Sequence, residues 1–218
     1  MIDIVFPDQN EEEFIKIAER LGYGSLCFFY RELKPAYKDH IEHLQKKTGI
    51  TLYTASSEIK KIMPDILVIK TTDPRQWIEG RKADLIYGME STNERDSITQ
   101  KRSGLNHVLC SLAKQKDKMI CFDFSSVLLS HGQRRAVIMG RMMQNIRLCR
   151  KYKVGTAIAS FAHEPLDMRN PSDLKAFFLM LGMDSNVIKK SLSSIEDRIK
   201  LNNRRKNNLL VHPGMERL

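Results

Sequence analysis

Residues 119–161 read MICFDFSSVLLSHGQRRAVIMGRMMQNIRLCRKYKVGTAIASF. The runs MICFDFS (119–125) and GTAIASF (155–161) are nearly continuous in apolar and β-branched residues, which is typical of strands covered on both faces of a parallel sheet. The segment between them has apolar residues at helical spacing: Ile138, Met142, Ile146 and Cys149. This order of strand, helix and strand predicts an α/β fold with a parallel sheet.

Five more runs of the same kind occur in the chain: IDIVF (2–6), SLCFFY (25–30), ITLYTA (50–55), DILVIKT (65–71) and DLIYGM (84–89). Helical patterns follow two of them. EEEFIKIAERLG has Asp8 or Asn10 as its expected N-cap, and SGLNHVLCSLAKQ has Ser103. Two further helices, opened by Asn170-Pro171 and spanning 185–203, follow the last strand without a strand between them.

These elements predict an irregular TIM-like (β/α) barrel with about seven parallel strands. No Gly-rich phosphate turn follows the first strand, so an open doubly wound sheet is less favoured. We expect residues 1–206 to form a single domain and residues 207–218 to form a flexible C-terminal tail.

The chain has 36 Lys plus Arg against 26 Asp plus Glu, a net charge of +10 that favours a polyanionic partner such as nucleic acid. No secretory signal is visible, and no apolar run is long enough to span a membrane. The four cysteines are widely spaced within apolar segments. We therefore expect a cytoplasmic protein with buried, reduced thiols.

A catalytic site in such a barrel would lie where the strands end. A metal hydrolase would need several His and carboxylate ligands there, but the first strand has IDIVFPD and no HxH pair. Asp8, Glu90 and His163 could meet by topology alone, although each also has an ordinary structural role available. Asp123 lies within an apolar strand and is expected to bond neighbouring backbone or a cation. The residues predict neither a catalytic group nor a metal site in this chain.

Positive charge is concentrated in three places. The stretch GQRRAVIMGRMMQNIRLCRKYKV (132–154) holds seven Lys and Arg and no acidic residue. Lys101 and Arg102 precede the helix expected at Ser103, and NNRRKNN (202–208) ends the last helix. Arg suits phosphate contacts, whereas the aromatic residues needed for base stacking are scarce here. The pattern favours recognition of folded nucleic acid through its backbone and shape.

Four segments of the chain carry a family resemblance: SGLNHVLCSLAKQK (103–116), ICFDFSSVL (120–128), GRMMQNIRLCRKYKV (140–154) and AIASFAHEPLDMRNPSDLKAFFLMLGM (157–183). In order and spacing they resemble the archaeal and eukaryotic family of RNase P protein component 3, the barrel-type protein subunit of that ribonucleoprotein. The matched segments cover most of residues 84–206, and the N-terminal third matches more loosely.

The resemblance implies a barrel of the polymerase-and-histidinol-phosphatase type without its metal site. It also implies a part in the endonucleolytic removal of the 5′ leader from precursor tRNA. The RNA subunit would perform this chemistry with Mg²⁺, and this chain would bind no cofactor. The implied partners are the catalytic RNA, protein component 2, other RNase P protein subunits and, as substrate of the complex, precursor tRNA.

The matching positions and the basic clusters together give the predicted RNA-binding residues: Lys101, Arg102, His107, Arg134, Arg141, Asn145, Arg147, Arg150, Lys151, Arg204, Arg205 and Lys206. Where the family has small residues after the seventh strand, this chain has SFAHEP, which argues against a role for His163. Two alternatives stay open at this point. One is an active metal-dependent phosphohydrolase on the same barrel, and the other is a scaffold whose basic helix binds an acidic protein.

Overall fold

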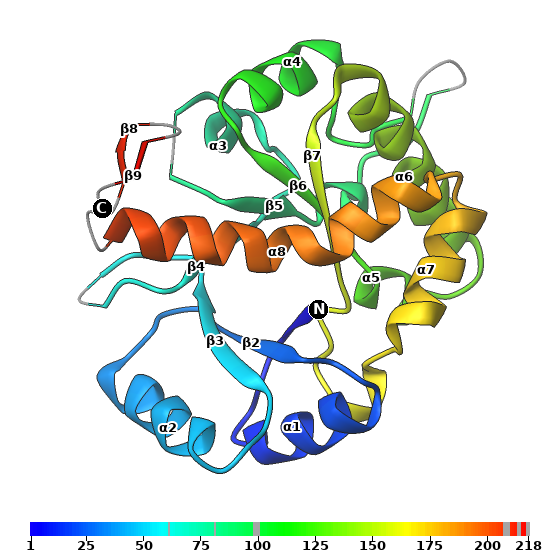
Figure 1. The fold of residues 1–218 in the computed structure, drawn as a ribbon. Helices are drawn as coiled ribbons and strands as arrows, with labels where there is room; N and C mark the ends of the chain where they lie inside the picture. Colours follow the sequence, from blue (N-terminus) through cyan, green and yellow to red (C-terminus); the bar gives the residue numbers. More distant parts are fainter. Residues whose placement is uncertain (61, 81, 98–100, 207–209, 213–214, 217–218) are drawn as a thin grey trace.

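The computed structural model describes residues 1–60, 62–80, 82–97, 101–206, 210–212 and 215–216. Seven strands form one sheet in which every neighbouring pair is parallel and the strand order follows the chain. The strands are β1 (Ile2–Val5), β2 (Ser25–Tyr30), β3 (Thr51–Ser56), β4 (Ile66–Lys70), β5 (Leu85–Tyr87), β6 (Met119–Asp123) and β7 (Gly155–Ala159). The predicted TIM-like barrel of seven parallel strands is confirmed (Figure 1).

Helices surround the strands (Figure 1). Among the described residues they are α1 (Glu11–Arg20), α2 (Pro35–Gln45), α3 (Arg75–Glu79), α4 (His107–Gln115), α5 (Ser125–Leu128), α6 (Gly132–Tyr152), α7 (Pro171–Met180) and α8 (Ser185–Lys206), with short 3-10 turns at Met89–Ser91 (η1) and Pro165–Asp167 (η2).

The caps of these helices agree only in part with the sequence patterns. Asn170 caps α7 as predicted, since its Oδ1 accepts from the backbone N–H of Ser172 at 2.7 Å. The prediction of Ser103 as a cap was wrong, because α4 begins later and Asn106 accepts from the N–H of Leu109 at 2.9 Å. Asn10 occupies the N-cap position of α1, but its side chain accepts from the N–H of Asp8 and bonds no helical N–H.

The barrel nearly closes between β1 and β7, a junction that we call the seam. Val5 and Ala162 form a single bridge there, and the N–H of Phe6 donates to the carbonyl of Ala162 at 2.9 Å. Asp3 on β1 adds a side-chain link, because its Oδ1 accepts from the N–H of Ser160 at 2.6 Å. A carboxylate therefore supplies part of the pairing that a continuous strand ladder would give.

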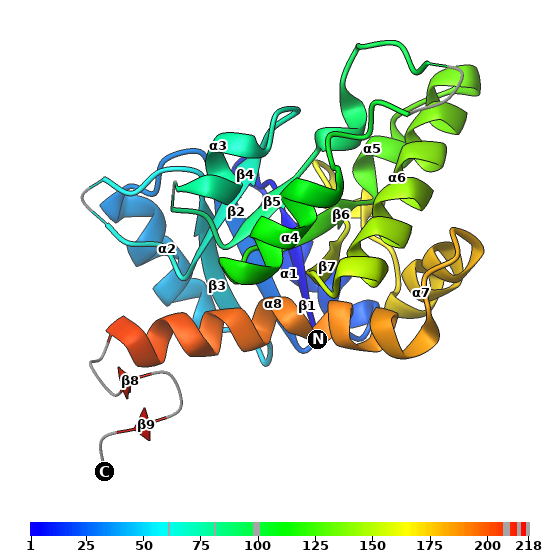
Figure 2. The same ribbon diagram turned by 90° about the horizontal axis from the view of Figure 1, so that it is seen from above.

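Helix α8 covers the end of the barrel at which the strands begin, which we call the basal face (Figure 2). Its side chains hydrogen bond to residues at or just before three strands: Arg198 to Asp117 before β6, Ser194 to Thr156 in β7, and Asn202 to Asp65 before β4. Ile195 and Ile199 of α8 are 0% exposed and pack among the side chains that fill the barrel interior. The last helix therefore plugs the barrel.

Two apolar layers lie outside the strands. One joins α1 and α2 to the N-terminal strands, and the other joins α4, α6 and α7 to β5, β6 and β7. The apolar residues that recur along α6 belong to the second layer and are buried, as predicted: Ile138, Met142, Ile146 and Cys149. The four cysteines are also buried, and none of them forms a disulfide.

The C-terminal tail was predicted to be flexible, and that stays a prediction. Residues 207–209, 213–214 and 217–218 of it lie outside the described residues. Its described parts are β8 (Leu210–His212) and β9 (Met215–Glu216), which pair in antiparallel fashion. No helix in the described part of the chain is long and apolar enough to cross a membrane.

The plugging role of α8 gives a first prediction. Ile195→Ala should lower the free energy of unfolding by about 2–5 kcal/mol, because it leaves a cavity in the barrel interior. Val108→Ala, at a site on α4 that is 50% exposed, should change it by less than about 0.5 kcal/mol. Urea denaturation of both variants measures the difference, and equal effects would show that α8 does not contribute to the core.

Candidate nucleic-acid interface

The outward face of α6 carries three exposed cations near its C-terminal end: Arg147, Arg150 and Lys151. The Nη1 of Arg150 lies 4.0 Å from the Oδ2 of Asp184, and both side chains are more than half exposed. The Nζ of Lys151 lies 5.7 Å from the ring centre of Tyr152. Exposed pairs of this kind hold a side chain only weakly, so these charges remain available to an anionic partner.

Arg134 lies at the other end of α6 and is exposed. Its Nη1 donates to the Oδ1 of Asn93 at 3.3 Å. Asn93 belongs to the segment that follows β5, on the face where the strands end (Figure 2). The predicted charge of α6 is thus divided between the two ends of the barrel.

Arg141 was predicted to bind RNA, but the structure places it inside the protein, where its side chain is only 3% exposed. Its guanidinium donates to the carboxylate of Asp96 at 2.9 Å and to the backbone carbonyls of Glu90 and Thr92 at 3.0 and 2.7 Å. It also bonds the carbonyl of Glu94. Because its donors are used in this way, Arg141 anchors the segment after β5 to α6 and is not a surface contact.

Asn145 requires the same correction, since it is fully buried. Its Nδ2 donates to the Oε1 of Glu90 at 2.7 Å and to the carbonyl of Ser103 at 2.8 Å. The neighbouring Gln144 donates to the Ser103 hydroxyl at 2.9 Å. Ser103 therefore attaches the loop that precedes α4 to helix α6. Its hydroxyl is used in this contact and does not cap α4.

Glu90 is the buried acid in this cluster. Burial raises its pKa to about 7, although the hydrogen bond from Asn145 and the charge of Arg141 act in the opposite direction. Glu90 faces α6, whereas Asp8 is exposed and His163 stacks on Phe6 with ring centres 4.5 Å apart. These different neighbours give no support to a catalytic group formed by Asp8, Glu90 and His163.

Other titratable groups near the ends of the strands also have structural partners. Asp123 accepts from the Ser125 hydroxyl at 2.8 Å and from the N–H of Ser126 at 3.2 Å, as expected, and burial raises its pKa to about 6. Burial and the charge of Lys70 lower the pKa of His163. Among the described residues, no three His, Cys, Asp or Glu side chains are grouped as metal ligands.

Lys101, Arg102 and His107 are exposed near the start of α4. Lys101 and Arg102 line a cavity of about 620 Å³ together with the N-cap residue Asn106. The Nε of Arg102 lies 3.7 Å from a carboxylate oxygen of Glu94, and both side chains are more than half exposed. The two cations therefore share a hollow with the beginning of a helix, where an anion is favoured.

The last predicted group lies at the C-terminal end of α8, on the basal face. Lys206 donates to the carbonyl of Pro64 at 2.6 Å and lies 3.7 Å from the Oδ1 of Asp65, so it helps to attach α8 to the barrel. Arg204 and Arg205 are exposed beside it. The predicted residues thus fall into separate groups on the two ends of the barrel.

Sequence reasoning missed five lysines that lie on or near the basal face: Lys82, Lys114, Lys116, Lys118 and Lys190. They lie outside the three basic stretches that the sequence indicated. Lys153 lies with them and belongs to the basic stretch 132–154, but it was not among the predicted RNA-binding residues. One signal could have found most of them. Several follow a helix and precede a strand, and such positions meet at the same end of a parallel barrel.

The fold and this surface define a TIM-like α/β barrel with a cationic outer helix. Residues 2–208 match the family described as RNase P subunit p30, and the chain belongs to that family. The ribonuclease P protein component 3 of Methanococcoides burtonii is 32% identical over 194 residues, which cover 84% of this chain and 77% of that protein. The protein of the same name from Methanococcus maripaludis is 25% identical over 221 residues, which cover 98% and 86%.

A chain in a cryo-EM structure of archaeal ribonuclease P with mature tRNA has the same fold. Its TM-score is 0.81 at 22% sequence identity, and the match covers 100% of this chain and 98% of that chain. The family membership makes this chain a protein subunit of ribonuclease P, so the prediction from the resemblance is confirmed.

The buried position of Arg141 separates structural from surface arginines on α6. Arg141→Ala should lower the free energy of unfolding by about 3 kcal/mol or more, because it removes the cation paired with Asp96 and the donor to the backbone carbonyls of Glu90, Thr92 and Glu94. Arg147→Ala should change it by less than about 0.5 kcal/mol. Thermal and urea denaturation measure both variants, and a stable Arg141→Ala protein would contradict the anchoring role.

Glu90 should make stability depend on pH. Its pKa is about 7 in the folded protein and 4.5 in its ordinary state. The stability that it contributes is therefore fully present below pH 4.5 and is lost as the pH rises through 7. Glu90→Gln keeps an acceptor for Asn145 and does not ionise. Relative to wild type, its free energy of unfolding should rise by on the order of 1–3 kcal/mol as the pH is raised from 5 to 8. Urea denaturation across this pH range measures both proteins. If their free energies of unfolding differ by the same amount at every pH, the ionisation of Glu90 does not control stability.

Proposed function

We propose that this chain acts in ribonuclease P by holding the catalytic RNA in its active shape through cationic surfaces on the barrel. The exposed cations on the outer face of α6, Arg147, Arg150 and Lys151, are the observation that carries this proposal. An RNA backbone offers closely spaced phosphates, and Arg binds phosphate through paired hydrogen bonds. The apolar face of the same helix is used by the core, so only its outer face is available to RNA.

The cleavage chemistry is assigned to the RNA subunit and its Mg²⁺ ions. In the described part of this chain the buried carboxylates have structural partners, since Asp123 bonds two neighbouring serines and Glu90 bonds Asn145. The chain would then raise the rate by positioning the RNA and would contribute no catalytic group of its own.

The chain would pair with protein component 2 within the complex, and the complex would remove the 5′ leader from precursor tRNA. The cryo-EM relative comes from archaeal ribonuclease P that contains mature tRNA, the product side of such a reaction, which supports this assignment. We also propose a cytoplasmic location, because the buried free thiols suit a reducing compartment.

A reconstitution tests this proposal. Cognate RNase P RNA, component 2 and Mg²⁺ are assayed for precursor-tRNA cleavage with and without this chain. We expect stimulation in the complete mixture and no cleavage by this chain with Mg²⁺ alone. Cleavage by the chain alone would instead support a metal-dependent phosphohydrolase. If the chain does not stimulate cleavage in the complete mixture, the remaining alternative is a scaffold whose basic helix binds an acidic protein.

The role of α6 is tested with Arg147→Ala plus Arg150→Ala. This double variant should bind RNase P RNA more weakly, and the slope of log K against log salt should fall by roughly one unit for each lost phosphate contact. The matched control is Arg20→Ala plus Arg31→Ala, which removes two exposed arginines from the other half of the barrel. An unchanged slope for the α6 variant would remove these residues from the RNA interface.

A further inference from the structure

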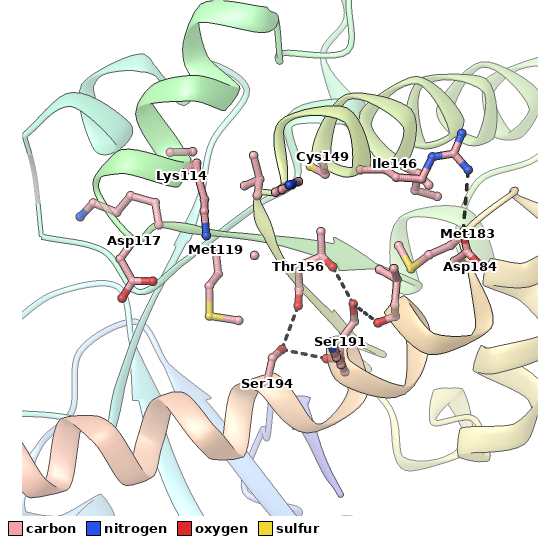
Figure 3. Close-up of a pocket in the computed structure, with 18 residues that line it drawn as sticks. Lys114, Asp117, Met119, Ile146, Cys149, Thr156, Met183, Asp184, Ser191 and Ser194 are labelled. Atoms are coloured by element: carbon pink, nitrogen blue, oxygen red, sulfur yellow. Dashed lines mark hydrogen bonds and ion pairs between the residues drawn. The ribbon is translucent and has the colours of Figure 1, made fainter. Parts of the chain in front are cut away.

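Two hollows lie side by side along α8 on the basal face and share Asp117 and Lys118 in their walls. The first has a volume of about 540 Å³ and lies between the C-terminal ends of α4 and α6, the start of β7 and the first half of α8 (Figure 3). The second, of about 450 Å³, continues past Arg198 to the end of α8. Together they form one groove, which we call the basal groove.

The basal groove is strongly cationic. Its walls contain three aspartates, Asp84, Asp117 and Asp184, and ten lysines and arginines: Lys82, Lys114, Lys116, Lys118, Arg150, Lys153, Lys190, Arg198, Arg205 and Lys206. All three aspartates have partners within the fold. Asp117 pairs with Arg198 at 2.9 Å, Asp184 lies 4.0 Å from Arg150, and Asp84 accepts from the N–H of Leu67 and from Asn202. Because the cations of the walls outnumber these aspartates by ten to three, the groove keeps a large net positive charge.

Lys118 lies at the junction of the two hollows, close to both cations and aspartates of the walls. Its Nζ donates to the carbonyl of Ala83 at 3.1 Å. Burial lowers its pKa, and the charges of Arg198 and Lys116 lower it further, although Asp84 and Asp117 act in the opposite direction. An anion in the groove would relieve the repulsion among these cations.

The floor of the first hollow shows what kind of anion fits. Met119 and Met183 supply apolar surface there. The hydroxyls of Thr156 and Ser191 lie 2.6 Å apart, and Ser194 donates to the carbonyl of Thr156, so these groups are already bonded to each other or to backbone (Figure 3). Among the residues that the structure describes, no aromatic side chain lines either hollow. The binding groups are thus the cations of the walls, and base stacking is not offered.

The length of the groove suits a chain of phosphates better than a single ion. From Lys190 to Arg205, α8 extends about 22 Å at roughly 1.5 Å per residue. Arg150 stands at the first hollow and also on the outer face of α6, so the groove continues the surface described above. An RNA strand that contacts α6 could therefore continue into the groove and remain in contact with positively charged side chains.

We propose that the basal groove is a second RNA-binding surface, which holds a stretch of RNase P RNA by its phosphodiester backbone. The inference rests on the proposed function, since it takes the RNA subunit as the partner. It adds the lysines of α8 and of the turns before the strands, and it joins them to two groups that the sequence indicated: Arg150 of α6, and Arg205 and Lys206 at the end of α8.

The test compares two triple variants of the full chain. Lys114→Gln, Lys153→Gln and Lys190→Gln remove three exposed charges from the first hollow. Lys16→Gln, Lys46→Gln and Lys47→Gln remove the same charge from exposed sites on α1 and at the end of α2, on the other half of the barrel. Each protein is measured for binding of cognate RNase P RNA over a range of KCl, and for stimulation of precursor-tRNA cleavage with component 2. Melting temperatures verify that both variants fold.

The groove variant should bind RNase P RNA roughly tenfold or more weakly than the control variant, and its salt slope should be smaller by about two units. If the groove variant matches the control while wild type stimulates cleavage, the groove proposal is overturned and the proposed function stands. If wild type neither binds the RNA nor stimulates cleavage, both fail. If the groove variant loses binding to component 2 in the absence of RNA and keeps its RNA affinity, the groove is a protein-binding surface and the proposal is wrong.

Discussion

Burial of the two isoleucines of α8 in the open end of the barrel is the interaction on which the rest of the structure depends. Seven short parallel strands enclose an interior that their own side chains do not fill, and Ile195 and Ile199 complete it. The polar side chains of α8 then bind the beginnings of the strands: Arg198 and Asn202 bond residues just before β6 and β4, and Ser194 bonds Thr156 in β7. Because all strands are parallel, these turns meet at one end, and α8 gathers them into a single basal face.

A second constraint is the buried guanidinium of Arg141. An arginine inside a protein must have its donors satisfied, and here they are satisfied by Asp96 and by carbonyls of the segment after β5. This set of bonds, with that of Asn145 to Glu90, fixes the rotation of α6 about its axis. The rotation decides which arginines face outward, so the cationic surface is a consequence of a buried polar cluster.

Much of the fold could be predicted from the sequence, because strands covered on both faces appear as continuous apolar runs and the buried stripe of α6 has helical spacing. Arg141 and Asn145 were misassigned because their partners are remote in sequence, as with Asp96, which lies 45 positions away. The start of α4 was misplaced because Ser103 and Asn106 are both good caps. The basal groove was missed because five of its lysines lie outside the basic stretches and meet the others only when the barrel forms.

The seam between β1 and β7 also has a consequence for biosynthesis. Asp3 and Ser160 are 157 positions apart, and the isoleucines that plug the barrel come later still. A ribosome therefore releases β1 long before β7, its neighbour across the seam, and the covering helix α8 exist. The inner faces of the early strands stay open to water, chaperones or other chains until β7 and the two isoleucines of α8 have been made. The barrel can close only after that point in its synthesis.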